Sequence, residues 1–278
     1  MTTNDSRCLR VGAVQMVSGG SLSRNLAEAE RLIAAAVGDG AELVALPENF
    51  ALMPADESAR RHAAEADGSG TVQEFLRTQA RYHGVWIVGG TIPLRAAERL
   101  RSACLVFNDQ GERVARYDKI HLFDAALKSG VYAESASFEA GNEVTIFPGP
   151  RFTVGLAVCY DLRFPSQFER LAEQGAELIV VPSAFTEETG RAHWELLVRA
   201  RSIDALAFVV APAQGGVHDN GRRTYGDTLI TSPWGEVLGR LKQGAGYIVT
   251  DLDAARLSQA RERLPALNRG ETHADRNA

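Results

Sequence analysis

The sequence predicts an α/β protein in which mixed β-sheets are covered by helices. Strand-like and helix-like segments alternate near both ends of the chain, and a hairpin pattern lies between them. Of the 278 residues, 45% are hydrophobic and 23% are charged, which is the composition of an ordinary globular protein. Because no low-complexity linker or internal repeat divides the chain, we expect one domain over 1–278, with its core at about 9–267 and a polar C-terminal tail at 269–278 that frays.

The first hundred residues have the rhythm of two successive strand–helix units. Apolar residues recur every three or four positions in the first expected helix, and Asn25 with Glu28 three residues later is typical of a capping pair. Gly38 and Gly84 each follow a helical pattern, at the position where glycine commonly ends a helix. The expected elements are, in order, a strand over 9–16, a helix over 25–37, a strand over 42–46, a helix that opens at Thr71-x-x-Glu74, and a strand over 85–89.

The second half begins with a hairpin and continues with alternating strands and helices. The short connection Asp109-Gln110-Gly111 separates two strand-like runs, as in a β-hairpin. A long loop is expected over 121–142, and the buried strand that follows runs directly into Cys159. The expected elements are, in order, strands over 102–108, 112–117 and 152–158, a helix over 166–174, a strand over 178–181, a helix over 192–206, strands over 207–211, 224–231, 237–240 and 247–252, and a polar helix over 253–263.

Charge and cysteine content argue against several partners and compartments. Thirty Lys and Arg against 35 Asp and Glu give a net charge of −5, so no basic field is present to bind a nucleic acid or an acidic membrane surface. The three cysteines, Cys8, Cys104 and Cys159, are too few and too scattered for a disulfide framework. The N-terminus lacks the apolar stretch of a signal peptide, and no apolar run approaches the ~20 residues that span a bilayer. We therefore expect a cytoplasmic protein.

The common motifs of metal and nucleotide chemistry do not occur in the sequence. It contains no Walker-type phosphate-binding loop, no GxGxxG, no HExxH and no GxSxG. The six histidines show no metal-ligand spacing with a cysteine or with one another. We therefore expect no metal and no cofactor.

Three short segments each place a reactive side chain where a strand ends, and the carboxyl ends of strands are where α/β proteins gather catalytic groups. Glu48 ends the segment Leu-Pro-Glu, Lys119 lies in DKIHLFD, and Cys159 begins CYDLRFP. Taken singly, these residues also fit a solvated loop glutamate, a surface lysine with a buried stem and a packed core cysteine. Cys159 differs from Cys8 and Cys104 because charged residues follow it directly, and a nearby cation or helix N-terminus lowers the pKa of a thiol.

Taken together, the three segments resemble signatures of the nitrilase (carbon–nitrogen hydrolase) superfamily. Their glutamate, lysine and cysteine occur in the family's order, with 71 residues from Glu48 to Lys119 and 40 from Lys119 to Cys159. The resemblance covers nearly the whole chain, over 9–267, and matches a second glutamate of the family to Glu134, whose alternative is a solvated loop residue. The resemblance implies a four-layer αββα sandwich and, because the family usually pairs through helices, a homodimer.

The resemblance further implies a thiol amidase that needs no metal, nucleotide or prosthetic group. In such an enzyme Glu48 takes the thiol proton, and Cys159 attacks the amide carbonyl carbon to form a thioester with release of ammonia. Lys119 and the backbone N–H of Tyr160 bind the oxyanion. Glu134 orients Lys119 or shares the proton transfer. The expected partner is thus a small-molecule amide substrate.

The residues after the nucleophile favour an amidase over a nitrile hydrolase. Nitrile hydrolases of the superfamily usually have Trp-Glu after the cysteine, whereas this chain has Tyr160-Asp161. The segments 182–186 and 232–235 are similar to those of deaminated-glutathione amidases, and this is the activity that the resemblance favours. The alternatives are an ω-amidase acting on α-ketoglutaramate, a general aliphatic amidase or N-carbamoyl hydrolase, and a catalytically silent interaction protein on the same fold.

The substrates of both amidase groups carry a carboxylate, and several residues are candidates to bind them. Arg163 is the candidate for the carboxylate because a guanidinium offers a planar bidentate fork; its alternative is an ion pair with Asp161 or a helix neighbour. Phe185 and Thr186 follow the strand 178–181 and are candidate pocket walls, although Phe185 fits core packing equally well. The remaining substrate-binding candidates are Tyr160 and Tyr225.

Overall fold

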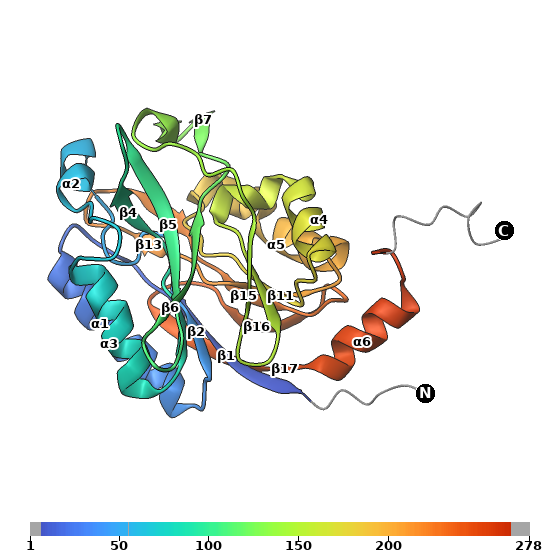
Figure 1. Cartoon of the computed structure of the whole chain (residues 1–278). Coiled ribbons are helices and arrows are strands. Elements are labelled where there is room, and N and C mark those ends of the chain that lie inside the picture. Colours follow the sequence, from blue (N-terminus) through green and yellow to red (C-terminus); the bar gives the residue numbers. More distant parts are fainter. Residues whose placement is uncertain (1–6, 55, 268–278) are drawn as a thin grey trace.

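Two β-sheets stacked on each other form the centre of the molecule (Figure 1). The computed structural model describes residues 7–54 and 56–267. The first sheet contains, in spatial order, β17 (Gly246–Asp253), β1 (Cys8–Gln15), β2 (Leu43–Ala45), β3 (Trp86–Val88), β5 (Leu100–Phe107) and β4 (Ile92–Arg95), with β6 (Arg113–Asp118) also paired to β5. The second contains β16 (Val237–Leu241), β15 (Thr228–Thr231), β12 (Phe208–Ala211), β11 (Leu178–Val180), β10 (Thr153–Leu156) and β9 (Thr145–Pro148). The strands β1, β2 and β3 run parallel in the first sheet, and β10, β11 and β12 run parallel in the second. The outer strands of both sheets pair antiparallel.

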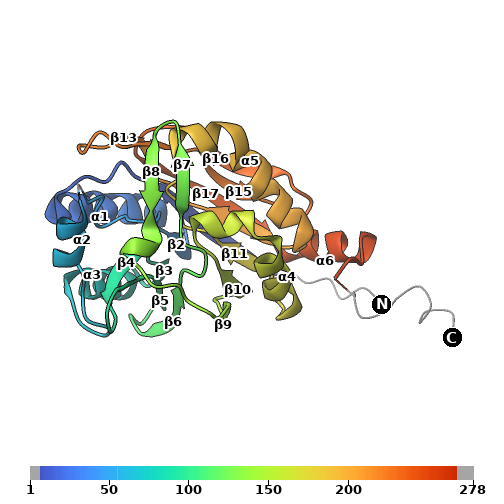
Figure 2. The ribbon, with the colours of Figure 1, turned by 90° about the horizontal axis from the view of Figure 1, so that it is seen from above.

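Helices cover the outer face of each sheet. The helices on the first sheet are α1 (Leu22–Gly38) and α3 (Thr71–His83), and those on the second are α4 (Pro165–Glu173) and α5 (Glu187–Asp204). The remaining helices are the short α2 (Glu57–His62), before α3, and α6 (Ala254–Arg263), after β17. In Figure 2, α1 and α3 lie on one side of the sheets and α4 and α5 lie on the other. The structure is therefore a four-layer αββα sandwich, as the sequence predicts.

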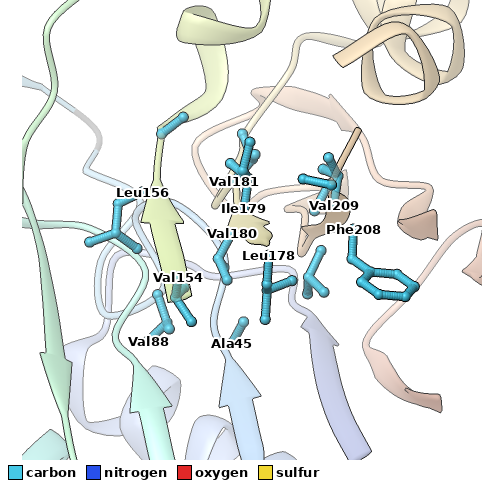
Figure 3. Close-up of a cluster of buried hydrophobic side chains, with 14 of the residues drawn as sticks. Ala45, Val88, Val154, Leu156, Leu178, Ile179, Val180, Val181, Phe208 and Val209 are labelled. Carbon is cyan, nitrogen blue, oxygen red and sulfur yellow. The ribbon is translucent and has the colours of Figure 1, made fainter. Parts of the chain in front are cut away.

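The main hydrophobic core lies between the two sheets. Val11 and Ala45 of the first sheet belong to the same buried cluster as Val154 and Leu178 of the second. Figure 3 shows Ala45, from β2 of the first sheet, beside Leu178, from β11 of the second. Because successive side chains of a strand point to opposite faces, Val44 instead joins a second cluster beneath α1 and α3.

Two glycines let a helix approach each sheet closely. Gly12 of β1 faces α1, where an added Cβ would lie 3.1 Å from the Cβ of Ala36. Gly155 of β10 faces α4, where an added Cβ would lie 3.1 Å from Cδ2 of Leu171. Both distances are shorter than ordinary van der Waals contact, so each helix packs on a strand at a position that has no side chain.

The start of α1 differs from the sequence prediction. The helix has Ser21 at its N-cap, so Asn25 and Glu28 do not form a capping pair. The Asn25 side chain is buried; its Nδ2 donates to the carbonyl oxygens of Gly19 and Ala51, both at 2.8 Å, and its Oδ1 accepts from the N–H of Gly19 at 2.9 Å. These hydrogen bonds of Asn25 connect α1 to the loops that follow β1 and β2.

Two predicted segments have a different structure. The long loop expected over 121–142 contains a hairpin of β7 (Asp124–Leu127) and β8 (Gly130–Ala133), followed by the 3₁₀ helix η1 (Glu134–Ala136). The single strand expected over 224–231 is divided into β14 (Arg223–Tyr225), which pairs with β13 (Gly215–Val217), and β15 of the second sheet. The chain bends between them because Gly226 and Asp227 have φ values of 73° and 63°.

Several boundaries also depend on features that periodicity does not show. Helix α5 begins at Glu187, five residues before its predicted start, because the Thr186 hydroxyl caps it by accepting a hydrogen bond from the N–H of Thr189 at 3.2 Å. The elements α2, β4, β9 and β13 were not predicted. The tail predicted to fray, 269–278, lies outside the described residues. Within the described ranges, no helix has the length and apolar character needed to cross a membrane.

The Asn25 hydrogen bonds predict a loss of stability on truncation. Asn25→Ala leaves the groups of Gly19 and Ala51 without these partners in a buried place, so we expect the free energy of unfolding to fall by about 1–3 kcal/mol. Urea denaturation measures this change. Ser21→Ala is the matched control, because the Ser21 side chain accepts no capping hydrogen bond and its loss is expected to change stability by less than about 0.5 kcal/mol. Equal effects of the two substitutions would contradict the assigned role of Asn25.

Candidate active site

The side chains of Glu48, Lys119, Glu134 and Cys159 meet in one pocket of about 230 Å³. Glu48 follows β2, Lys119 follows β6 and Cys159 follows β10, each within three residues of the end of its strand. The pocket therefore lies where strands of both sheets end, the edge at which α/β proteins build ligand sites. The β7–β8 hairpin, which lies across the middle of the molecule in Figure 2, contributes to its wall.

Lys119 is the centre of a buried ion-pair network. Its side chain is 2% exposed, and its Nζ lies 2.8 Å from Oε1 of Glu48 and 2.9 Å from Oε2 of Glu134. Burial on its own lowers the pKa of a lysine, but the charges of Glu134 and Glu48 outweigh burial and raise the pKa of Lys119 well above its usual range. Lys119 is thus a fixed cation inside the pocket and not a surface lysine with a buried stem.

Glu134 reaches Lys119 from the turn after the β7–β8 hairpin. It is the first residue of η1, and its Oε2 accepts a hydrogen bond from the N–H of Phe123 at 2.6 Å in addition to the bond from Lys119. Its side chain is 16% exposed. Glu134 is therefore an ion-pair partner of Lys119 whose position is fixed by hydrogen bonds. The alternative, a solvated loop residue, does not fit the structure.

Cys159 stands on a strained turn between β10 and the 3₁₀ helix η2 (Cys159–Arg163). Its φ of 49° lies in the left-handed region, which costs a residue with a Cβ roughly 1–2 kcal/mol. The N–H of Cys159 donates to the carbonyl oxygen of Pro182 at 3.0 Å, which fixes the turn against the segment after β11. Because η2 starts at the cysteine, the backbone N–H of Tyr160 is one of the first donors of the helix and lies next to the nucleophile.

The surroundings of Cys159 favour the protonated form of its thiol when no substrate is bound. Burial and the negative charge of Glu48 raise the pKa of the thiol well above its usual range, and the charge of Lys119 offsets only part of this rise. The expectation that a cation and a helix N-terminus lower the pKa of this thiol is therefore wrong, because desolvation is the largest effect here. The thiol needs a base, and Glu48 is positioned to be that base because it also hydrogen-bonds the thiol.

A buried hydrogen-bond network joins the lysine segment to the cysteine turn. Asp161 is fully buried; its Oδ2 accepts from the Tyr117 hydroxyl at 2.6 Å and from the N–H of Val158 at 2.7 Å. Its Oδ1 accepts from the N–H of His121 at 3.1 Å and lies 2.7 Å from Nδ1 of the same histidine. Tyr117, His121 and Asp161 each lie two residues from Lys119 or Cys159, and that spacing is the signal in the sequence that could have found them.

The pocket contains most of the predicted substrate-binding residues. Those that line it are Tyr160, Arg163, Phe185 and Thr186. Tyr225 does not line it: β14 places this tyrosine against Gly190 of α5, where any added Cβ would overlap the Tyr225 side chain. Tyr225 is therefore corrected from a pocket candidate to a packing residue.

Arg163 does not form the ion pair with Asp161 that was its alternative. Its guanidinium carbon lies 5.8 Å from the ring centre of Tyr160 and 5.5 Å from that of Phe185. Its two terminal nitrogens each lie 3.4 Å from Nδ1 of His193. Cation–π contacts with these two rings hold the guanidinium at the pocket wall.

Other charged and aromatic side chains of the pocket were missed by sequence analysis. They are Arg60, Phe123, Tyr132, Phe138 and Arg222. Arg60 lies in the short helix α2 and Arg222 lies between β13 and β14, in segments that carry no chemical motif. Throughout residues 7–54 and 56–267, no group of three or more His, Cys, Asp or Glu side chains is arranged to hold a metal ion.

The charges around Cys159 predict the titration of its thiol. Glu48→Gln removes a negative charge that opposes the thiolate and retains Lys119, so the pKa of Cys159 is expected to fall relative to the wild-type protein. The pH dependence of alkylation by iodoacetamide, followed on the Cys159 peptide by mass spectrometry, measures this shift. Glu28→Gln, which changes a carboxylate of α1 paired with Arg31, is the control and is expected to give the wild-type profile. A profile displaced to higher pH in Glu48→Gln would contradict the assignment.

Comparisons with known proteins identify the family of the chain. The carbon–nitrogen hydrolase family matches residues 10–262. A deaminated glutathione amidase of Yersinia enterocolitica is 40% identical over 262 residues, and the match covers 92% of this chain and 91% of the relative. The human omega-amidase NIT2 is 32% identical, and the match covers 92% of each chain. The crystal structure of Saccharomyces cerevisiae Nit3, a member of branch 10 of the nitrilase superfamily, is similar with a TM-score of 0.85 and 27% identity, covering 95% of this chain and 97% of that chain. The resemblance inferred from the three segments is thus confirmed, and the chain belongs to the carbon–nitrogen hydrolase family of enzymes, which act on non-peptide amide bonds.

Proposed function

We propose that this protein hydrolyses the amide bond of a small carboxylate-bearing substrate through a thioester on Cys159, and that this substrate is deaminated glutathione. The observation that carries the proposal is the convergence of a thiol, a carboxylate and an ammonium group in one pocket, from Cys159, Glu48 and Lys119. The choice of substrate is supported by the 40% identity to a deaminated glutathione amidase over 92% of the chain.

In the first half of the reaction, Glu48 accepts the proton of the Cys159 thiol and the sulfur attacks the carbonyl carbon of the amide. A C–S bond forms, and the electron pair of the carbonyl π bond moves to its oxygen. Glu48 then donates its proton to the amide nitrogen, the C–N bond breaks, and the amine leaves from a thioester. One carboxylate thus moves a single proton from sulfur to nitrogen.

The oxyanion of this step is bound by Lys119 and by the backbone N–H of Tyr160. An ammonium group has three N–H donors. In the pocket Oε1 of Glu48 accepts at 2.8 Å, and the two oxygens of Glu134, at 2.9 and 3.2 Å, accept from one direction and can share one N–H. The third donor is left for the oxyanion, and one such donor contributes about 2.7–4 kcal/mol to the transition state of acyl transfer. Glu134 is a positioning residue, because its carboxylate holds the ammonium in place.

In the second half of the reaction, water replaces the amine. Glu48 takes a proton from this water, the hydroxide attacks the thioester carbon, and the C–S bond breaks. The thiolate recovers its proton from Glu48, and the acid product leaves. The raised pKa of Cys159 favours this last step, since the protonated thiol is the stable form in the resting pocket.

The leaving group depends on the substrate. For deaminated glutathione it is not the ammonia that we expected from the sequence. Glutathione is γ-glutamyl-cysteinyl-glycine. In its deaminated form a keto group replaces the α-amino group, so the glutamyl part is an α-keto acid joined to the cysteine nitrogen by a secondary amide. Cleavage of that amide releases a dipeptide amine and not ammonia. Ammonia is the product only for the alternative substrate, α-ketoglutaramate, which the 32% identity to the human omega-amidase keeps as a second candidate.

We also propose that the protein is a cytoplasmic homodimer of one catalytic domain, with no nucleic acid or membrane partner. Leu196 and Ile203 of α5 and the nearby Trp234 are exposed by 69%, 42% and 44%, and exposed apolar side chains around one helix support a subunit contact. The three free cysteines support a reducing compartment. The net charge of −5 supports the absence of a polyanionic partner, and the core shared by the two sheets supports one domain.

The mechanism predicts that the acyl group is found on Cys159. Wild-type protein mixed with deaminated glutathione and quenched in acid is expected to carry a substrate-derived acyl group on the Cys159 peptide in mass spectrometry. Cys159→Ala is expected to lose this adduct and to reduce turnover by about a thousandfold or more, whereas Cys8→Ala, which changes an exposed thiol, serves as the control and retains both. Turnover by a folded Cys159→Ala protein at the wild-type rate would exclude the thioester.

The choice of substrate predicts a preference in steady-state kinetics. For the wild-type protein, kcat/KM with deaminated glutathione is expected to exceed kcat/KM with α-ketoglutaramate by about tenfold or more. Release of α-ketoglutarate, the acid product of both amides, provides one assay for the two reactions. A preference for α-ketoglutaramate of the same size would make the protein an ω-amidase instead.

A further inference from the structure

Two arginines of the pocket have no carboxylate partner. Among the described residues, no Asp or Glu oxygen lies within ion-pair distance of Arg163 or Arg222. Arg60, the third arginine of the pocket, is different, because its Nη1 lies 3.2 Å from Oε2 of Glu57. The pocket therefore contains two guanidinium groups whose charge the protein does not neutralise locally.

The protein around Arg222 leaves most of its hydrogen-bond donors without a close acceptor. Its Nε is buried and has no hydrogen-bond partner in the part of the chain that the structure describes. Its Nη2 lies 3.4 Å from the carbonyl oxygen of Ala184, and its Nη1 lies 3.8 Å from the sulfur of Met53, both long contacts. A guanidinium has five N–H donors in a fork that matches a carboxylate, so a ligand carboxylate is the group that completes this site.

The backbone beside Arg222 is held in place. The carbonyl oxygen of Arg222 accepts a hydrogen bond from the N–H of His218 at 2.9 Å. The buried His218 ring is in turn fixed at both nitrogens, with Nδ1 2.7 Å from the carbonyl oxygen of Ser18 and Nε2 2.7 Å from Oγ1 of Thr224. Arg222 thus projects from a fixed turn between β13 and β14, which is what a preorganised binding residue requires.

The two arginines are connected to different groups of the proposed reaction. Arg222 contacts Met53, in the loop that follows Glu48, and the segment before β13 is tied to that loop by a hydrogen bond from Nε2 of Gln214 to the carbonyl oxygen of Glu48 at 3.1 Å. Glu48 is the residue that protonates the leaving nitrogen in the proposed mechanism. Arg163 instead ends η2, the 3₁₀ helix that begins with the nucleophile Cys159.

We infer that Arg222 binds a carboxylate on the leaving-amine part of the substrate while Arg163 binds the carboxylate on the acyl part. This inference rests on the proposed function and adds a substrate class to it: amides that carry a carboxylate on each side of the bond that is cut. Deaminated glutathione has this form, with an α-keto acid on one side and the glycine carboxylate on the other. α-Ketoglutaramate has only the first carboxylate, so it leaves Arg222 without a ligand.

The test compares variants on three substrates that differ in the leaving group. The substrates are deaminated glutathione, the same molecule with its glycine carboxylate converted to an amide, and α-ketoglutaramate. Arg222→Gln is expected to lower kcat/KM for deaminated glutathione about tenfold to a hundredfold more than for α-ketoglutaramate, mainly through KM. Arg163→Gln is expected to lower kcat/KM for all three. Arg223→Gln, which changes the neighbouring arginine that is 61% exposed and paired with Glu187, is the matched control and is expected to change none.

The amidated substrate tests the inference without any variant. Wild-type protein is expected to hydrolyse it about tenfold to a hundredfold less efficiently than deaminated glutathione, and Arg222→Gln is expected to cause no further selective loss on it. If Arg222→Gln lowers the three activities by the same factor, Arg222 has a structural role and the inference is wrong, although the proposed function stands. If wild-type protein hydrolyses none of the three substrates, the proposed function itself is wrong.

Discussion

The buried ammonium of Lys119, held between two carboxylates, is the interaction on which the pocket depends. Removing one member of a buried ion pair typically costs about 3–5 kcal/mol, because the remaining charge is left without water or partner. Glu48, Glu134 and Lys119 arrive from three separate parts of the chain, so the contact forms only when the first sheet and the β7–β8 hairpin are both in place. The charged site is therefore complete only when these elements are folded.

The network joins two carboxyl groups to one ammonium group, and this composition adds to the effect of burial on the nucleophile. Burial raises the pKa of the Cys159 thiol most, and the charge of Glu48 raises it further, so the thiol keeps its proton. During the proposed reaction the negative charge passes from Glu48 to sulfur, then to the oxyanion, and no step adds a charge to the pocket. Lys119 stays within reach of each position, and Asp161 fixes the distance between the lysine segment and the cysteine turn. Such a preorganised cation stabilises the transition state without rearrangement.

The sequence shows some of these features better than others. The places of Glu48, Lys119 and Cys159 could be predicted because strand-like runs of the sequence, 42–46, 112–117 and 152–158, end just before them. Glu134 needed a resemblance, and Arg222 was missed, because both are presented by hairpins whose strands carry no run of buried apolar residues. Tyr225 was assigned to the pocket wrongly, because Gly226 and Asp227, which adopt positive φ and turn the chain, were interpreted as part of one strand. Asn25 was misread as a cap because its true partners, Gly19 and Ala51, are contacts of the tertiary structure.

In the proposed reaction Cys159 is acylated while Lys119 and the Tyr160 N–H bind the oxyanion. A crystal structure of the protein with an aldehyde analogue of the acyl group is the decisive test, since a thiol adds to an aldehyde and gives a tetrahedral carbon that mimics the intermediate. We expect a covalent bond from Sγ of Cys159 to that carbon, with the new oxygen within hydrogen-bond distance of both Nζ of Lys119 and the backbone nitrogen of Tyr160. An adduct whose oxygen points away from both donors, or one that forms on another residue, would contradict the account.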